Sequence, residues 1–188
     1  ATRQRNAEGG FWHKTKYPQE MWADGIYMGG PFLIKYGYLF NDLEYCADEV
    51  VRQTVLMAEH AQDPETGLLY HGWDYDHNAN WADPSTGLSA YCWGRGNGWY
   101  AMALVEILEY LPENYPGYTR LLAILEQMAR GIKLTQDETS GLWYQVMEEG
   151  GRKANWLETS GSGMFIYALK IATEKGYIDR SYLKVAER

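Results

Sequence analysis

The chain has 188 residues, of which 46% are hydrophobic and 22% are charged, a composition typical of one folded domain. Its 17 basic and 25 acidic residues give a net charge of -8, which argues against a nucleic-acid-binding surface. No apolar run approaches the roughly 18 to 20 residues of a membrane-spanning helix, so an integral membrane protein is excluded.

Aromatic residues are unusually abundant in this chain. It contains 8 Trp, 16 Tyr and 4 Phe, which together make up 15% of the residues. Trp and Tyr combine a flat apolar face with a polar group, so they suit packing against sugar rings as well as packing in a core. The composition therefore favours a carbohydrate-handling protein.

A short pattern occurs twice along the chain. Residues 63–70 read DPETGLLY and residues 137–144 read DETSGLWY, while EGGFW at residues 8–12 is a degenerate earlier copy. After each copy, a polar stretch containing Gly precedes an apolar segment with helical spacing. We therefore expect a loop and two helices, repeated roughly every 65 to 74 residues.

The first helix of each unit carries small residues, and the second carries the charges. The first helices are expected over residues 26–38, 99–111 and 164–172, and the second helices over 45–61, 118–134 and from Ser181 onward. Small residues let inner helices crowd around a common axis, and charged outer helices then face the solvent. This pattern predicts an all-α toroid with its loops around a central cavity, of which about three hairpins are present.

The polar residues that precede the inner helices are the candidates for chemistry. Asp24 lies between Trp22 and Gly25 on an otherwise apolar face, so we expect it to be poorly solvated and its pKa to be raised. Such a carboxyl is suited to general acid catalysis. The alternative is that Asp24 caps a helix by accepting hydrogen bonds from backbone amides.

The polar segment at residues 70–83 contains one candidate functional histidine, His71, whose alternative role is that of a satisfied loop residue. Residues 74–78 begin like a calcium-binding loop. However, Ala79 stands at the sixth position, where Gly is needed, and Ser85 at the twelfth, where Glu is needed. We therefore expect no metal site.

Residues 91–100 read YCWGRGNGWY and place Arg95 between Trp93 and Trp99. A planar guanidinium beside aromatic faces suits a sugar that bears a carboxylate. The alternative is a structural Arg paired with an acidic neighbour. Glu158 is either a second carboxylate of the cavity or, more simply, part of a helix start.

The two cysteines, Cys46 and Cys92, are too few for a disulfide scaffold and lack metal-ligand spacing, so we expect reduced thiols in or near the core. An acidic chain with few cysteines favours the cytoplasm. A periplasmic or secreted location stays open, because the chain begins at Ala1 without an initiator Met.

Four segments in order carry a family resemblance: QEMWADGIYM at 19–28, HGW at 71–73, WGRGNGWYAMAL at 93–104 and GLWYQV at 141–146. Together they resemble the unsaturated rhamnogalacturonyl hydrolases of glycoside hydrolase family 105. They are more distantly similar to the unsaturated glucuronyl hydrolases of family 88. The likeness extends over essentially the whole chain.

The resemblance implies an (α/α)6 barrel, with residues 1–188 as a single domain from the central to C-terminal part of the catalytic unit. It implies an oligosaccharide substrate that ends in a 4,5-unsaturated uronic acid, and no nucleic acid, membrane, metal or organic cofactor. In the implied reaction an acid protonates C4, water adds at C5, and the hemiketal collapses and releases the neighbouring sugar. The implied roles are acid/base for Asp24, sugar binding for His71, Arg95 and Trp99, and aromatic platforms for Trp22 and Trp93.

The chain also departs from the family's pattern. Family members are roughly twice as long, and their second active-site Asp lies on an upstream inner helix. Two other functions therefore stay open. One is an inverting glycosidase that pairs Asp24 with Asp74 or Glu158 across a cleft. The other is a sugar-binding half-barrel without turnover.

Overall fold

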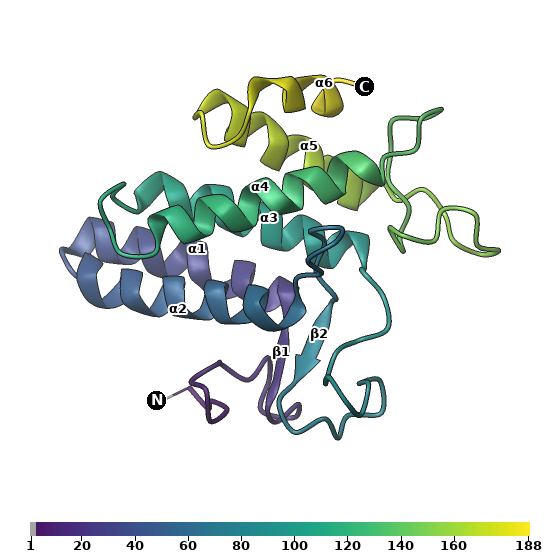
Figure 1. Cartoon of the computed structure of the whole chain (residues 1–188). Helices are drawn as coiled ribbons and strands as arrows, with labels where there is room; N and C mark the ends of the chain where they lie inside the picture. Colours follow the sequence, from purple (N-terminus) through teal and green to yellow (C-terminus); the bar gives the residue numbers. More distant parts are fainter. Residues whose placement is uncertain (1–2) are drawn as a thin grey trace.

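The computed structural model describes residues 3–188 and is mostly helical (Figure 1). Its helices are α1 (Ala23–Phe40), α2 (Leu43–Ala61), α3 (Gly94–Tyr110), α4 (Tyr118–Leu134), α5 (Thr159–Glu174), η1 (Arg180–Tyr182) and α6 (Leu183–Ala186). Two short strands, β1 (Glu20–Trp22) and β2 (Gly72–Asp74), pair antiparallel. The predicted all-α class and the predicted alternation of inner and outer helices along the chain are confirmed.

The helices form hairpins in which α1, α3 and α5 lie side by side, with α2 and α4 packed against one side of this layer (Figure 1). Glycines let the inner helices approach closely. A Cβ on Gly98 of α3 would stand 2.8 Å from the Met164 side chain of α5, and one on Gly30 of α1 would stand 3.1 Å from Ile107 of α3. The apolar core fills the space between the two layers.

The inner helices begin earlier than the sequence predicts, at Ala23, Gly94 and Thr159 instead of residues 26, 99 and 164. The Gly-containing stretches that we interpreted as loops are therefore first helical turns. In α3 the buried Asn97 exchanges two hydrogen bonds of 2.8 Å with the backbone N–H and C=O of Leu69. These tertiary contacts outweigh the low helix propensity of glycine.

The repeated pattern has a common conformation. Asp63 and Asp137 each accept hydrogen bonds from residues two or three positions on, and the Gly that closes each turn has positive φ, +82° at Gly67 and +73° at Gly141. The segment DPSTG at residues 83–87 forms the same turn, a further copy that was not predicted from the sequence. Each copy reverses the direction of the chain, before the chain enters the next inner helix or pairs with a strand.

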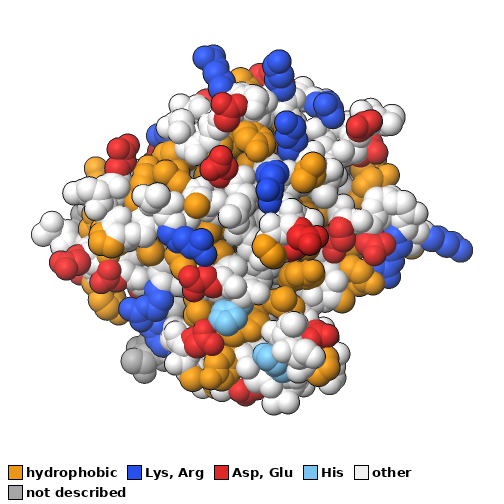
Figure 2. All heavy atoms as spheres, in the orientation of Figure 1, with side chains coloured by type: hydrophobic (Ala, Val, Ile, Leu, Met, Phe, Trp, Pro, Cys, Tyr) orange, Lys and Arg blue, Asp and Glu red, His pale blue; other side chains and the backbone are white. Residues whose placement is uncertain are grey.

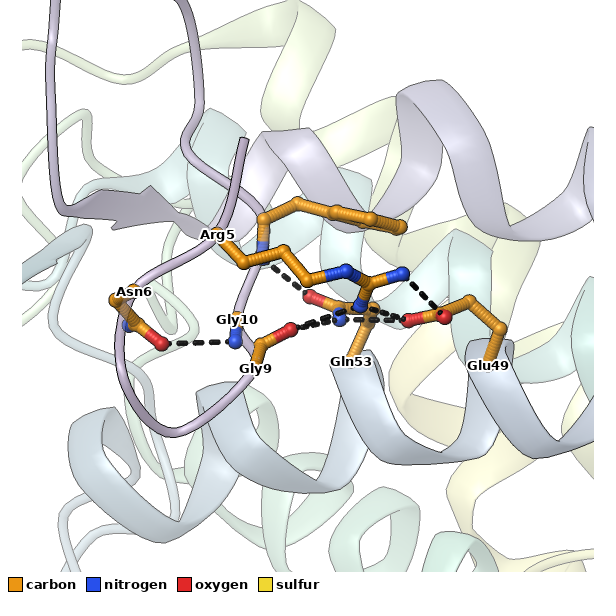
Figure 3. A network of polar contacts seen from close by, with 7 residues as sticks. Arg5, Asn6, Gly9, Gly10, Glu49 and Gln53 are labelled. Atoms are coloured by element: carbon orange, nitrogen blue, oxygen red, sulfur yellow. Dashed lines mark hydrogen bonds and ion pairs between the residues drawn. The ribbon is translucent and has the colours of Figure 1, made fainter. Parts of the chain in front are cut away.

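The N-terminal segment is fastened to α2 by a polar network (Figure 3). Arg5 forms a bidentate ion pair with Glu49 of α2, at 2.8 and 2.7 Å. Gln53, one turn along α2, accepts a 2.8 Å hydrogen bond from the N–H of Phe11 and donates one to the Gly9 carbonyl. This network fixes the path of the loop that continues into β1.

The surface of one face carries interspersed acidic, basic and hydrophobic side chains, with several basic groups at the end where α5 and α6 lie (Figure 2). Among the described residues, no helix combines the length and hydropathy that a bilayer span requires. One face of α1 exposes large apolar side chains three or four residues apart: Met28, Phe32, Tyr36, Leu39 and Phe40. Cys46 and Cys92 are buried and unbridged, as predicted.

Candidate active site

The β1–β2 pair brings Asp24 and His71 together. Trp22 pairs with Gly72, and the next backbone N–H, that of Ala23, donates a 2.9 Å hydrogen bond to the His71 carbonyl. The helix α1 begins at this point, so the carboxylate of Asp24 lies in its first turn. Asp24 Oδ1 stands 3.9 Å from His71 Nε2, and both side chains are about one-fifth exposed, at 21% and 23%.

A second histidine, His13, also contacts Trp22. Its ring stacks on the Trp22 indole at 4.2 Å between centroids and 14° between planes. A Cβ on Gly25 would stand 3.1 Å from His13 Nδ1, so the first turn of α1 passes close to this ring. His13 was not predicted from the sequence. The signal that could have found it is the repeat, because His13 directly follows the degenerate copy at residues 8–12 as His71 follows the copy at residues 63–70.

Three buried polar atoms of this cluster lack a hydrogen-bond partner within residues 3–188: Asp24 Oδ1, His71 Nδ1 and His13 Nδ1. Asn6 Nδ2 is the other such side-chain atom in the described part of the chain. Buried polar atoms are nearly always hydrogen-bonded in folded proteins. The unpartnered Asp24 oxygen, which lies 3.9 Å from His71 Nε2, marks a site suited to a polar ligand.

Burial lowers the pKa of His71, and the nearby Asp24 carboxylate opposes this effect only in part. Burial likewise lowers the pKa of His13, again against the attraction of Asp24. Both imidazoles are therefore neutral near pH 7, and each has one N–H donor and one nitrogen acceptor.

Trp93 connects this cluster to Arg95. The His71 ring meets the Trp93 ring edge-on at 4.7 Å, and the Arg95 guanidinium lies over the same indole at 4.4 Å. Arg95 Nη1 also forms a 3.0 Å ion pair with Glu158 Oε1, so the expected pairing with an acidic neighbour is present. A guanidinium has five N–H donors, and this pair occupies one of them.

Glu158 caps the start of α5, which confirms the simpler of its two predicted roles. Its carboxylate accepts hydrogen bonds from the Gly161 N–H at 2.8 Å, from Arg95 and from the Ser160 hydroxyl. Burial alone would raise the pKa of Glu158, but these hydrogen bonds lower it overall. Glu158 is thus a charged structural group.

Trp99 lies one helical turn beyond Arg95 on α3. Its ring packs against Tyr27 of α1 at 4.8 Å, and the Tyr27 hydroxyl donates a 3.1 Å hydrogen bond to Glu106. Tyr27 follows Asp24 by one turn of α1, so the two inner helices hold the carboxylate and this tryptophan on neighbouring faces. The six predicted site residues therefore gather at the starts of α1 and α3, with Trp99 one turn deeper.

Asp74 is committed to its own loop. The side chain is buried, and it accepts hydrogen bonds from the N–H groups of Asn78 at 2.6 Å and Ala79 at 2.7 Å. The two carboxylates considered as partners of Asp24, Asp74 and Glu158, thus both hold local backbone structure. Within residues 3–188, no three His, Cys, Asp or Glu side chains are grouped as metal ligands would be.

Side-by-side helical hairpins, with a carboxylate, imidazoles and tryptophans at one end of the inner helices, are the arrangement of the α/α-toroid class. The model of Glycosyl Hydrolase Family 88 matches residues 1–188, so the chain belongs to this family. The resemblance inferred from the four sequence segments is thereby confirmed.

Relatives and solved structures agree with this assignment. A family 105 glycoside hydrolase from C. acetobutylicum is 40% identical, superposes with a TM-score of 0.95, and aligns with 98% of this chain and 51% of its own. The unsaturated rhamnogalacturonyl hydrolase YesR of Bacillus subtilis is 30% identical over 153 residues, which are 81% of this chain and 41% of that protein. A 24.9 kDa protein in the picA locus of Rhizobium radiobacter is 36% identical over 159 residues, 85% of this chain and 66% of that protein.

An unsaturated glucuronyl hydrolase from Bacillus sp. GL1, at 18% identity and a TM-score of 0.68, shares the fold. The chain thus corresponds to part of an (α/α)6 toroid and spans about half the length of the C. acetobutylicum enzyme. This agrees with the three hairpins predicted from the repeat.

Proposed function

We propose that the protein acts on oligosaccharides left by polysaccharide lyases and releases the 4,5-unsaturated uronate from their non-reducing end, with Asp24 as acid and base. The carrying observation is the buried, unpartnered Oδ1 of Asp24, which lies 3.9 Å from Nε2 of the His71 ring. Rhamnogalacturonan fragments are the favoured substrates. The name of the B. subtilis relative, an unsaturated rhamnogalacturonyl hydrolase, supports this choice.

The residues around Asp24 have complementary roles in binding. The guanidinium of Arg95 directs its remaining N–H donors to the uronate carboxylate, because only one of them is used by Glu158. The indoles of Trp22, Trp93 and Trp99 offer apolar faces for the sugar ring. The neutral imidazoles exchange hydrogen bonds with the sugar hydroxyls.

The reaction is a hydration of the vinyl ether formed by C4, C5 and the ring oxygen. Asp24 in its acid form gives its proton to C4, and the positive charge that develops at C5 is shared with the ring oxygen. Water then adds to C5 and returns one proton to the Asp24 carboxylate. The hemiketal opens to a C5 ketone, and the hemiacetal left at C1 expels the neighbouring sugar. The balance is one water consumed per bond broken.

The test follows the ultraviolet absorbance of the conjugated enoate in lyase-treated rhamnogalacturonan fragments, for the wild-type chain and for Asp24→Asn. The proposal predicts that the wild type removes the absorbance and that Asp24→Asn does not. Cleavage of saturated oligosaccharides without loss of enoate would instead support an ordinary glycosidase. Binding that is equal in both proteins, without turnover, would support a sugar-binding module.

A further inference from the structure

Glu20, on the short strand β1, is a buried carboxylate outside the groups assigned above. Only 7% of its surface is exposed. Burial of a carboxylate carries a large desolvation cost unless hydrogen bonds offset it. The Glu20 Oε2 atom accepts a 2.8 Å hydrogen bond from Nε1 of Trp22, two residues along the strand and therefore on the same face.

We infer that Glu20 is a positioning residue for the reaction, which holds the Trp22 indole in place against the His13 and His71 rings near Asp24. This inference rests on the proposed function. Trp22 stacks on His13 at 4.2 Å and meets His71 at 5.5 Å. A rotation of the indole therefore moves both imidazole rings, those of His13 and His71.

Among the groups around the Trp22 indole, Glu20 is the one that accepts its hydrogen bond. Trp22 has one side-chain donor, Nε1, and Glu20 is its acceptor. Its Cδ1 edge lies over Gly72, at 3.4 Å from where a Cβ would stand, and Trp81 covers the same glycine. Packing alone restricts the plane of the ring, whereas the hydrogen bond to Glu20 selects its orientation within that plane.

Burial raises the pKa of Glu20, and the negative charge of Asp74, its cross-strand partner, acts in the same direction. The hydrogen bond from Trp22 and a contact from Trp81 oppose the shift. A desolvated carboxylate beside a second acidic group is an expensive arrangement for a three-residue strand. The Glu20 carboxylate serves the Trp22 indole rather than the pairing of the strand, which uses backbone groups.

The experiment compares Glu20→Leu, which removes the acceptor, with Glu20→Gln, whose amide oxygen still reaches Trp22. The matched control is Gln136→Leu, which alters another buried polar side chain, one that donates hydrogen bonds to the carbonyls of Gly141 and Val185 rather than to any residue of the site. Two quantities are measured for each protein. One is the ¹⁵N–¹H signal of the Trp22 indole, assigned by its loss in Trp22→Phe. The other is the pair of kcat and KM for an unsaturated rhamnogalacturonan disaccharide.

Loss of one hydrogen bond to a charged acceptor predicts that Glu20→Leu raises KM by about 10-fold with a smaller change in kcat, and shifts the indole signal. Glu20→Gln should restore KM to within about 3-fold of the wild type. Gln136→Leu should lower the melting temperature and leave KM unchanged. Should Glu20→Leu fail to fold, Glu20→Asp replaces it, because the shorter carboxylate cannot reach the indole and predicts the same rise in KM.

An unchanged KM and indole signal in the Glu20 variants would overturn the inference, as would a rise in KM in Gln136→Leu equal to that in Glu20→Leu. The proposed function is judged separately, on the wild type. A wild-type chain that neither consumes nor binds the enoate would refute that function, and the role of Glu20 in the reaction would then be rejected with it.

Discussion

Gly96, in the first turn of α3, provides a direct test of the arrangement around His71. A Cβ at this position would stand 2.5 Å from His71 Nδ1 and 3.3 Å from the Trp93 ring. Ordinary contact begins at 3.4 Å, so in Gly96→Ala the imidazole must retreat by about 0.9 Å. The rings of Trp22 and Trp93 border His71 at 5.5 and 4.7 Å and limit where it can go.

The retreat changes the separation of His71 from Asp24, which is 3.9 Å in the wild type. A displacement of about 1 Å at a catalytic site costs on the order of 100-fold in rate, so we expect a loss of this size in kcat/KM. Stability should change much less. The overpacking cost of about 1–3 kcal/mol is offset by about 1 kcal/mol of helix propensity gained when Ala replaces Gly.

The assay is consumption of the enoate, with the ¹⁵N signals of His71 as a second readout and Gly29→Ala as control. Nothing lies within 4 Å of a Cβ built on Gly29, in the interior of α1, so this variant should gain up to about 1 kcal/mol and keep its activity. Wild-type kcat/KM in Gly96→Ala, with unshifted His71 signals, would refute the reasoning.

Three further predictions concern stability and reactivity. Asn97→Ala leaves the N–H and C=O of Leu69 without partners in the core, so urea denaturation should show a loss of about 2–4 kcal/mol, and a loss below 1 kcal/mol would contradict it. For Glu49, burial raises the pKa, but the bonds from Arg5 and Gln53 outweigh it and lower the pKa below 4.5. The resulting stability is present above pH 4.5 and lost as the pH falls through the lower value. Arg5→Met should therefore cost about 1–2 kcal/mol at neutral pH, with a gap to the wild type that narrows in acid; a gap independent of pH would be inconsistent with this linkage. Burial raises the pKa of Cys92, so iodoacetamide should modify this thiol only upon unfolding, which mass spectrometry would detect; rapid labelling of the native chain would count against the fold.

Helical periodicity carried most of the fold. The apolar face of residues 118–134 predicted a helix with those bounds, because three- and four-residue spacing has a single geometric meaning. The starts of the inner helices were predicted too late. Gly94, Gly96 and Gly98 have low helix propensity, and only their neighbours in the fold reveal why glycine is required there: the Tyr144 carbonyl, the His71 ring and the Met164 side chain of α5, respectively.

Part of the candidate site could likewise be predicted from the sequence, and part of it could not. Asp24, His71 and Arg95 stood out because each lies in a polar segment next to an inner helix. His13 belongs to the N-terminal segment, which the ion pair between Arg5 and Glu49 fastens to α2. These two residues are 44 positions apart, and no local pattern encodes that contact. The sequence also left two roles open for Arg95. The structure shows the pair with Glu158, and the role in binding a uronate stays a prediction.

The central claim is that Asp24 starts the reaction by delivering a proton to C4 of an unsaturated uronate. The most direct measurement runs the reaction in D₂O and examines the uronate product, which carries C4, by ¹H NMR at early times. The account predicts one deuterium at C4 for each bond broken, and none with Asp24→Asn. Release of the neighbouring sugar with the C4–C5 double bond intact would contradict it.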